Sequence, residues 1–373
     1  MKIVEFTAAS LRFLDQAPAQ APADGFVWIY LERGEFADRL AEQQAIAERL
    51  GGAPLLDVHA KDLASETHPS HYDATSVYDR VIFRRLANAQ EAREAGEAAE
   101  GAEGAADVLA RIDSRAVGFA VFDRLLISVH PPGCQSAASL IERLAADLRL
   151  AVDSPAARSR LPQSPTDVAL HMINAMVDRY LELRKQLGRA LEQTQSALLH
   201  ARPRAGVWPA LMRARQRLHL LQELCEEQQD AMQEWLDTLR EVPLSAYAAE
   251  PLLAQARRDQ LMARARDVMQ HIDRVLHHAR RLEQSAEAAV QIHFNAQGQR
   301  TNDIMRTLTA ITAVFLPLNL FTGFFGMNFD HLPLIHSGAG MWIALALLVA
   351  LAVAIVVLFW QRRYLGPGSE DEP

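Results

Sequence analysis

Two uncharged stretches near the C-terminus are the strongest pattern of apolar and polar positions in the chain. Residues 307–329 and residues 338–360 contain no charged side chain, and the second stretch has no polar face. A helix rises 1.5 Å per residue, so about 20 apolar residues cross the hydrocarbon core of a bilayer. Both stretches reach that length, and the sequence therefore predicts two transmembrane helices.

Basic residues around these stretches set the predicted orientation. Arg300 and Arg306 precede the first stretch, and Arg362 and Arg363 follow the second. The connection over residues 326–339 contains no lysine or arginine. Because cytoplasmic loops are enriched in these residues, we expect both termini in the cytoplasm. The chain would then be a multi-pass protein of the inner (cytoplasmic) membrane, in contact with membrane lipids.

The N-terminal part mixes strand and helix patterns. Residues 26–31 and 76–86 favour strands, whereas residues 36–50 have helical spacing. Residues 116–130 have the pattern of a β-hairpin with its turn near the middle. Between them, residues 90–104 are rich in Ala, Glu and Gly, which is typical of a solvated loop. The predicted class of this cytosolic part is α+β.

Helical sequence follows from residue 164 onward. The spacing predicts one helix over residues 166–200 and another over residues 210–239. Residues 252–316 contain no proline, and only Gly298 interrupts a helix-forming pattern that continues into the first apolar stretch. An unbroken helix of about 75 residues would be about 110 Å long. We favour one stalk helix over two helices broken near Gly298.

A partly polar series of residues recurs at alternating intervals of three and four, which places it on one helix face. The series is Asn302, Met305, Thr309, Thr312, Leu316, Asn319 and Gly323. Polar groups in hydrocarbon are costly unless they contact each other or water. This face therefore either joins helices in an interface or lines a pore made by several copies of the chain. We favour the pore, in which Met305, Leu308 and Leu316 would be apolar constrictions.

Composition excludes several other classes of protein. The net charge of −8 argues against a nucleic-acid partner. Cys134 and Cys225 are far apart and lack metal-site spacing, which is typical of reduced, buried thiols. The sequence has no P-loop, G-x-S-x-G or H-E-x-x-H motif, so we expect neither an enzyme nor an organic cofactor.

These patterns divide the chain into successive regions. They are a cytosolic α+β domain (1–160), a cytosolic helical hairpin region (161–250), a stalk helix (251–303), a pore-lining transmembrane helix (304–326), an extracytoplasmic loop (327–339), a second transmembrane helix (340–361) and a cytosolic tail (362–373).

The end of the first apolar stretch carries a family resemblance. Residues 325–329 are Phe-Gly-Met-Asn-Phe, after a long helix and before a second apolar stretch. In that position the motif resembles the Tyr-Gly-Met-Asn signature of the CorA-type (CorA/ZntB-like) family of magnesium and divalent metal ion transporters. Residues 301–305 and 315–317 are also similar to the family at matching spacing. The resemblance covers residues 170–365 and reaches the N-terminal third only through its strand pattern.

The resemblance implies a funnel-shaped homopentamer that conducts divalent cations. Asn328 would form a ring at the outer mouth, with Gly326 and Met327 shaping the loop. Since Mg²⁺ releases its water reluctantly, amide oxygens can hold the hydrated ion. Asn302 would form an inner polar ring. Asp267 matches a family position that binds a regulatory Mg²⁺ between cytosolic domains and holds the channel shut.

The loop between the apolar stretches does not identify which ion is transported. Phe325 stands where the signature has tyrosine, and residues 332–335 lack the acidic residue common in the family. Asp330 is the only acid left there to attract cations, while His331 and His336 favour Zn²⁺ over Mg²⁺. We expect uptake of Mg²⁺, with Co²⁺ or Ni²⁺ as further ions. The alternatives are a proton-coupled Zn²⁺ transporter and a non-conducting membrane-anchored sensor or scaffold.

Overall fold

The computed structural model describes residues 1–7, 10–87, 112–134, 136–151, 162–199, 207–248, 250–327 and 338–361. The chain separates into two compact units, Met1–Ala289 and Val290–Pro373, and each is described by itself. The predicted loop over residues 90–104 lies outside the described residues. Cys134 and Cys225 are both free and buried, as predicted.

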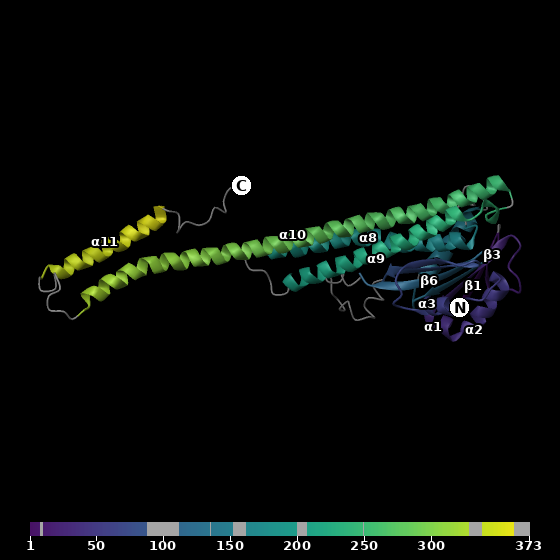
Figure 1. The fold of residues 1–373 in the computed structure, drawn as a ribbon, viewed down its shortest axis with the longest axis horizontal. Helices are drawn as coiled ribbons and strands as arrows, with labels where there is room; N and C mark the ends of the chain where they lie inside the picture. Colours follow the sequence, from purple (N-terminus) through teal and green to yellow (C-terminus); the bar gives the residue numbers. More distant parts are fainter. Residues whose placement is uncertain are drawn as a thin grey trace. The chain divides into compact units, whose positions relative to one another are not determined.

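A seven-stranded mixed sheet is the centre of the first unit (Figure 1). Its strands are β1 (Lys2–Thr7), β2 (Leu11–Leu14), β3 (Gly25–Glu32), β4 (His71–Ala74), β5 (Tyr78–Leu86), β6 (Ser114–Phe122) and β7 (Leu125–His130). Their order across the sheet is β2-β1-β3-β7-β6-β5-β4. The α+β class predicted for this part of the chain is confirmed.

Strand pairing agrees with the sequence in part. The predicted hairpin is confirmed, because β6 and β7 pair antiparallel with Val121 opposite Leu126. The strands predicted at residues 26–31 and 76–86 correspond to β3 and β5. By contrast, β1, β2 and β4 were not predicted. Neither was the parallel pairing of β3 with β7, the only parallel pair among the described strands.

Short helices cover one face of the sheet: α1 (Arg33–Asp38), α2 (Leu40–Ile46) and α3 (Asp57–Ala64), with a π-helical turn at Ala47–Gly51. The single helical pattern predicted for residues 36–50 is therefore divided. It ends at Gly52, whose φ of 90° lies in the left-handed region that glycine adopts readily. A Cβ at Gly118 of β6 would lie 2.6 Å from Leu63 Cδ2, so glycine allows α3 to pack close to the sheet.

Longer helices cover the other face: α6 (Ser136–Ala151), α8 (Pro165–Leu199) and α9 (Val207–Glu241). Helix α9 buries Leu211, Ala214, Leu218, Leu221, Cys225, Gln228, Met232, Trp235 and Leu239, at alternating intervals of three and four. That spacing forms a continuous seam on a helix, as in coiled coils. The seam packs α9 against its neighbours in the first unit.

The predicted long helix is confirmed, since α10 extends from Pro251 to Phe325 as one element without a break at Gly298. Its first part belongs to the first unit and joins α8 and α9 there. The second unit contains residues 290–325 of α10 and helix α11 (Gly340–Gln361).

Candidate functional site

Helix α10 carries a segment with the length and apolar character of a membrane span. Only 6% of that apolar window is buried within the chain, which separates it from the core helix of a soluble protein. Helix α11 contains a shorter apolar stretch, Trp342–Leu358. Within the described part of the chain, α10 is the only helix that satisfies both criteria in full.

The polar series expected to line a pore lies on α10 and is exposed along its whole length. Its members, together with Leu308, are Asn302, Met305, Leu308, Thr309, Thr312, Leu316, Asn319 and Gly323, and each is exposed in a single chain. The apolar ones are exposed as strongly as the polar ones, with Leu316 at 67% and Met305 at 59%. We refer to these residues as the α10 polar face.

Hydrogen bonding within α10 affects which polar groups can contact a ligand. The Thr312 hydroxyl donates a hydrogen bond to the carbonyl of Leu308 at 2.9 Å, so its proton is committed to the helix and its oxygen remains an acceptor. Pro317 lies inside the helix and has no N–H to donate to the carbonyl of Ala313. Pro317 thus leaves the carbonyl of Ala313 without its helical donor, and Thr312 presents its oxygen as an acceptor. Acceptors are the groups that solvate a cation.

The helix ends just before the signature motif. Gly326 N donates to Thr322 O at 2.9 Å, which continues the helical pattern by one residue, and Met327 is 46% exposed. Asn328 and Asp330, predicted at the pore mouth, lie outside the described residues, as do His331 and His336.

The expected regulatory residue Asp267 belongs to a series of ion pairs that sequence reasoning missed. His271 Nε2 lies 3.7 Å from Asp267 Oδ1, and His271 Nδ1 lies 3.1 Å from Asp178 Oδ1 on α8. Both carboxylates are about half exposed, whereas His271 is 16% exposed. The i, i+4 spacing of Asp267 and His271 could have revealed one neighbour, but Asp178 is supplied by the packing of α8 on α10.

This trio does not form a closed metal site. No group of three His, Cys, Asp or Glu side chains among the described residues is placed to hold a metal ion. A cation at Asp267 would therefore need ligands in addition to those of this cluster.

A family model described as "CorA-like Mg2+ transporter protein" matches residues 23–363. That match includes strands β3 to β7 of the sheet, the long helices and both apolar helices. The chain belongs to the CorA-like Mg²⁺ transporter family. The membership suggested by the Gly-Met-Asn motif is thus confirmed.

Curated relatives match parts of the chain. The "Cobalt/magnesium transport protein CorA" of Thermotoga maritima is 25% identical over 194 residues, which are 52% of this chain and 51% of that protein. The "Putative metal ion transporter YfjQ" of Bacillus subtilis is 37% identical over 65 residues, 17% of this chain and 20% of that protein. The chain therefore spans about half the length, or less, of these curated relatives.

Solved structures share the fold over almost the whole chain. The complete structure of the CorA magnesium transporter from Methanocaldococcus jannaschii gives a TM-score of 0.71 at 15% identity, with 96% of this chain and 97% of that chain covered. The full-length CmaX protein gives a TM-score of 0.58 at 19% identity, with 98% and 97% covered. Because both sequence identities are below 20%, these two matches show that the fold is shared.

Proposed function

We propose that this CorA-family chain forms a Mg²⁺ channel in the cytoplasmic membrane. Several copies of α10 surround a shared aqueous path, and α11 is the second span. The α10 polar face is the observation that carries the proposal, since it combines two amides and two hydroxyls with apolar residues and all of them are exposed in one chain. The family resemblance points to a homopentamer with both termini in the cytoplasm.

The chemistry of this face suits a hydrated dication. Asn302 and Asn319 supply amide oxygens near the two ends of the face, and Thr309 and Thr312 supply hydroxyl oxygens between them. Mg²⁺ keeps several waters, so acceptors at this spacing can bind its hydration shell without stripping it. The membrane potential drives entry, because a 2+ ion gains about 4.6 kcal/mol per 100 mV as it moves inward.

Cysteine accessibility tests the shared path. The native thiols are buried, with Cys134 6% and Cys225 1% exposed, so an introduced cysteine can be labelled over a low background. We expect Asn302→Cys and Asn319→Cys to react with a charged aqueous thiol reagent in proteoliposomes. Ile311→Cys, which lies outside the face, is the control that should react slowly. Equal protection of all three thiols would refute an aqueous path.

The same variants test self-association. One chain carries a single copy of each introduced cysteine, so an Asn319→Cys disulfide can form only between two chains. We expect oxidation to yield crosslinked oligomers from Asn319→Cys and few from Ile311→Cys. A chain that stays monomeric in the bilayer would exclude the pore.

Uptake assays test the role of Asn328 at the proposed pore mouth and the identity of the transported ion. We expect proteoliposomes with an inside-negative potential to take up Mg²⁺, and Asn328→Ala to abolish that uptake without preventing assembly. Comparing Mg²⁺, Co²⁺, Ni²⁺ and Zn²⁺ at equal concentration ranks the ions. Full uptake by an assembled Asn328→Ala channel would remove this residue from the proposed mouth.

A proton-coupled Zn²⁺ transporter is the second candidate. The observation in its favour is the pair His331 and His336 in the loop between the apolar stretches, because imidazole binds Zn²⁺ better than Mg²⁺. Zinc uptake that requires a pH gradient, together with little Mg²⁺ uptake, would support this candidate over the first.

A regulatory cation at Asp267 is part of the channel proposal. His271 lies beside Asp267 and pairs in turn with Asp178, and the remaining ligands would come from a neighbouring subunit. We expect Asp267→Asn to weaken inhibition of uptake by internal Mg²⁺, with uptake itself retained. Unchanged inhibition in Asp267→Asn would remove this residue from regulation.

A further inference from the structure

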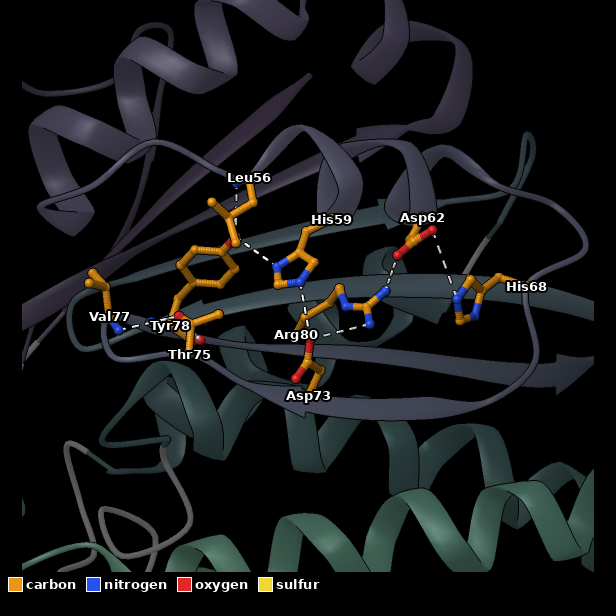
Figure 2. A network of polar contacts seen from close by, with 9 residues as sticks. All are labelled: Leu56, His59, Asp62, His68, Asp73, Thr75, Val77, Tyr78 and Arg80. Carbon is orange, nitrogen blue, oxygen red and sulfur yellow. Dashed lines mark hydrogen bonds and ion pairs between the residues drawn. The ribbon is translucent and has the colours of Figure 1, made fainter.

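Charged groups packed on the sheet compensate one another. In Figure 2 the guanidinium of Arg80 lies between the carboxylates of Asp62 and Asp73, with Arg80 Nη2 3.5 Å from Asp73 Oδ2. His59 Nε2 lies 3.0 Å from the same Asp73 oxygen, and His59 Nδ1 lies 2.8 Å from the Tyr78 hydroxyl. Because its members satisfy one another, this network stabilises the contact of α3 with β4 and β5 and leaves few polar groups for a ligand.

Helix α10, by contrast, contains a backbone acceptor that lacks its helical donor. In an α-helix the carbonyl of each residue accepts a hydrogen bond from the N–H four residues later. Pro317 lies inside α10 and has no N–H, so the carbonyl of Ala313 loses that donor. This carbonyl lies in the middle of the apolar stretch, far from either end of the helix.

Other carbonyls of the same stretch have an additional donor. The hydroxyls of three threonines each donate to the carbonyl four residues earlier, besides the N–H that the helix supplies. These bonds are Thr307 to Asp303 at 2.9 Å, Thr312 to Leu308 at 2.9 Å and Thr322 to Leu318 at 3.0 Å. Among the described residues no side-chain hydroxyl or amide donates to the carbonyl of Ala313 in this way. Its oxygen is therefore available to a donor from outside the helix.

The Ala313 carbonyl lies at the edge of the α10 polar face. A helical carbonyl points along the axis toward the residues three and four positions later, which here are Leu316 and Pro317. Leu316 belongs to the α10 polar face and is 67% exposed, whereas Pro317 is partly buried. An unsatisfied carbonyl is costly in hydrocarbon, so its stable surroundings are water or polar groups. The carbonyl thus adds an acceptor at the level of Leu316.

Side-chain acceptors of the α10 polar face are missing at this level. Between Thr312 and Asn319 the only member of the face is Leu316, and these seven residues of helix cover about 10 Å. Mg²⁺ keeps several of its waters, and those waters direct their hydrogens outward to acceptors. In this interval the Ala313 carbonyl can accept such a hydrogen, whereas the Leu316 side chain cannot.

We propose that the carbonyl of Ala313, left without its helical donor by Pro317, binds the hydration shell of the transported cation as it passes Leu316. With one carbonyl from each copy of the chain, the site is a ring of backbone oxygens. Pro317 is then a functional part of the path because it frees this oxygen. The inference rests on the channel proposed above.

Restoring the donor tests this role. Pro317→Ala supplies an N–H that can bond to the Ala313 carbonyl, so we expect Mg²⁺ uptake by proteoliposomes to fall about tenfold, the size expected for one lost hydrogen bond. Lactic acid at position 317 has the side chain of alanine but an ester oxygen in place of the N–H, so uptake should return close to the wild-type rate. Wild-type uptake by Pro317→Ala, or equally low uptake with lactic acid, would overturn the proposal.

A second ester separates the freed carbonyl from a general loosening of the helix. Leucic acid in place of Leu318, combined with Pro317→Ala, removes the donor to the carbonyl of Val314 instead. We expect no recovery of uptake in this variant, since the Ala313 carbonyl stays bonded. Recovery equal to that given by lactic acid at position 317 would assign the effect to helix flexibility and exclude the carbonyl.

Thiol labelling gives a readout that does not depend on flux. We expect Leu316→Cys to react with a charged aqueous reagent when Pro317 is present, and several-fold more slowly when combined with Pro317→Ala. Equal reactivity in the two backgrounds would count against hydration by the carbonyl. Wild-type channels that conduct while both Pro317→Ala readouts stay unchanged would refute this inference alone, whereas absent Mg²⁺ uptake with a protected Asn319→Cys would refute the channel itself.

Discussion

Two stretches of helix α10 have the same residue spacing but differ in side-chain chemistry and in burial. In the first unit, Leu261, Ala265, Val268, Ile272, Val275 and Ala279 recur at intervals of three and four and are buried within the chain. In the second unit, the α10 polar face has the same intervals, apart from Leu308, and is exposed. Spacing determines which residues share a face, whereas side-chain chemistry determines what that face contacts. The apolar seam finds its partners within the chain, whereas the polar face is exposed in a single chain.

Polar contacts differ between the two stretches in the same way. In the first unit they join separate helices, as in the hydrogen bond from Gln222 Nε2 on α9 to Glu283 Oε2 on α10 at 2.5 Å. On the α10 polar face, the Thr312 hydroxyl bonds to the carbonyl of its own helix. The first unit is therefore stabilised by contacts that mutations can break in a single chain. The α10 polar face is best tested by measuring the accessibility of introduced cysteines and the flux of ions.

Truncating Trp235 should have the largest effect on stability. Trp235 is 0% exposed and packs between α9 and β4. We expect Trp235→Ala to lower the free energy of unfolding by about 3–5 kcal/mol, because the truncation leaves a cavity. Chemical denaturation followed by circular dichroism measures it. Leu220→Ala, on the exposed side of α9, is the control and should cost less than about 1 kcal/mol; similar losses in both variants would contradict the burial described for Trp235.

Removing Arg264 should have the next largest effect. Arg264 Nη1 lies 2.7 Å from Asp167 Oδ1, and Asp167 is only 2% exposed. We expect Arg264→Ala to destabilise the first unit by about 3 kcal/mol, since a buried carboxylate loses its cation. Denaturation at neutral pH measures the loss.

The pH dependence of this pair gives an independent check. Burial acts to raise the pKa of Asp167, but His171 and Arg264 hold it below its ordinary value. A lowered pKa contributes stability above the unfolded pKa, and this stability is lost as pH falls through the folded value. Arg264→Ala should therefore lose less stability than the wild type on acidification, and parallel pH profiles would show that the pair is not coupled.

Replacing Asn319 should affect transport without affecting the first unit. We expect Asn319→Leu to reduce Mg²⁺ flux at least about tenfold, equivalent to 1.4 kcal/mol in the barrier, because a polar acceptor is lost from the face. Ile311→Leu is the matched control and should conduct normally. Equal flux in both variants would place Asn319 outside the conduction path, and a change in unfolding would show that its role is structural.

The exposed pair of Arg306 and Asp303 should have the smallest effect. The Arg306 Nη1 to Asp303 Oδ1 distance is 3.9 Å and both side chains are exposed. We expect Asp303→Asn to change the free energy of unfolding by less than about 0.5 kcal/mol, because solvent screens such pairs. A larger change in thermal unfolding at moderate salt would mean that this part of α10 has partners beyond its own helix.

The sequence by itself determined features that depend on neighbouring residues along the chain. The absence of charge over residues 307–329 and 338–360 predicted the apolar helices, and the absence of proline over residues 252–316 predicted the long helix. Helical periodicity also predicted which residues share the α10 polar face. Each of these follows from local rules of helix geometry and solvation, so no knowledge of distant contacts was needed.

Only the tertiary structure decided which distant segments meet. The parallel pairing of β3 with β7 and the position of Asp178 beside His271 both join residues far apart in sequence. An apolar strand or helix face specifies that it needs a partner but not which partner. That choice results from many weak packing contacts summed over the whole fold, and a pattern read along one segment does not contain them.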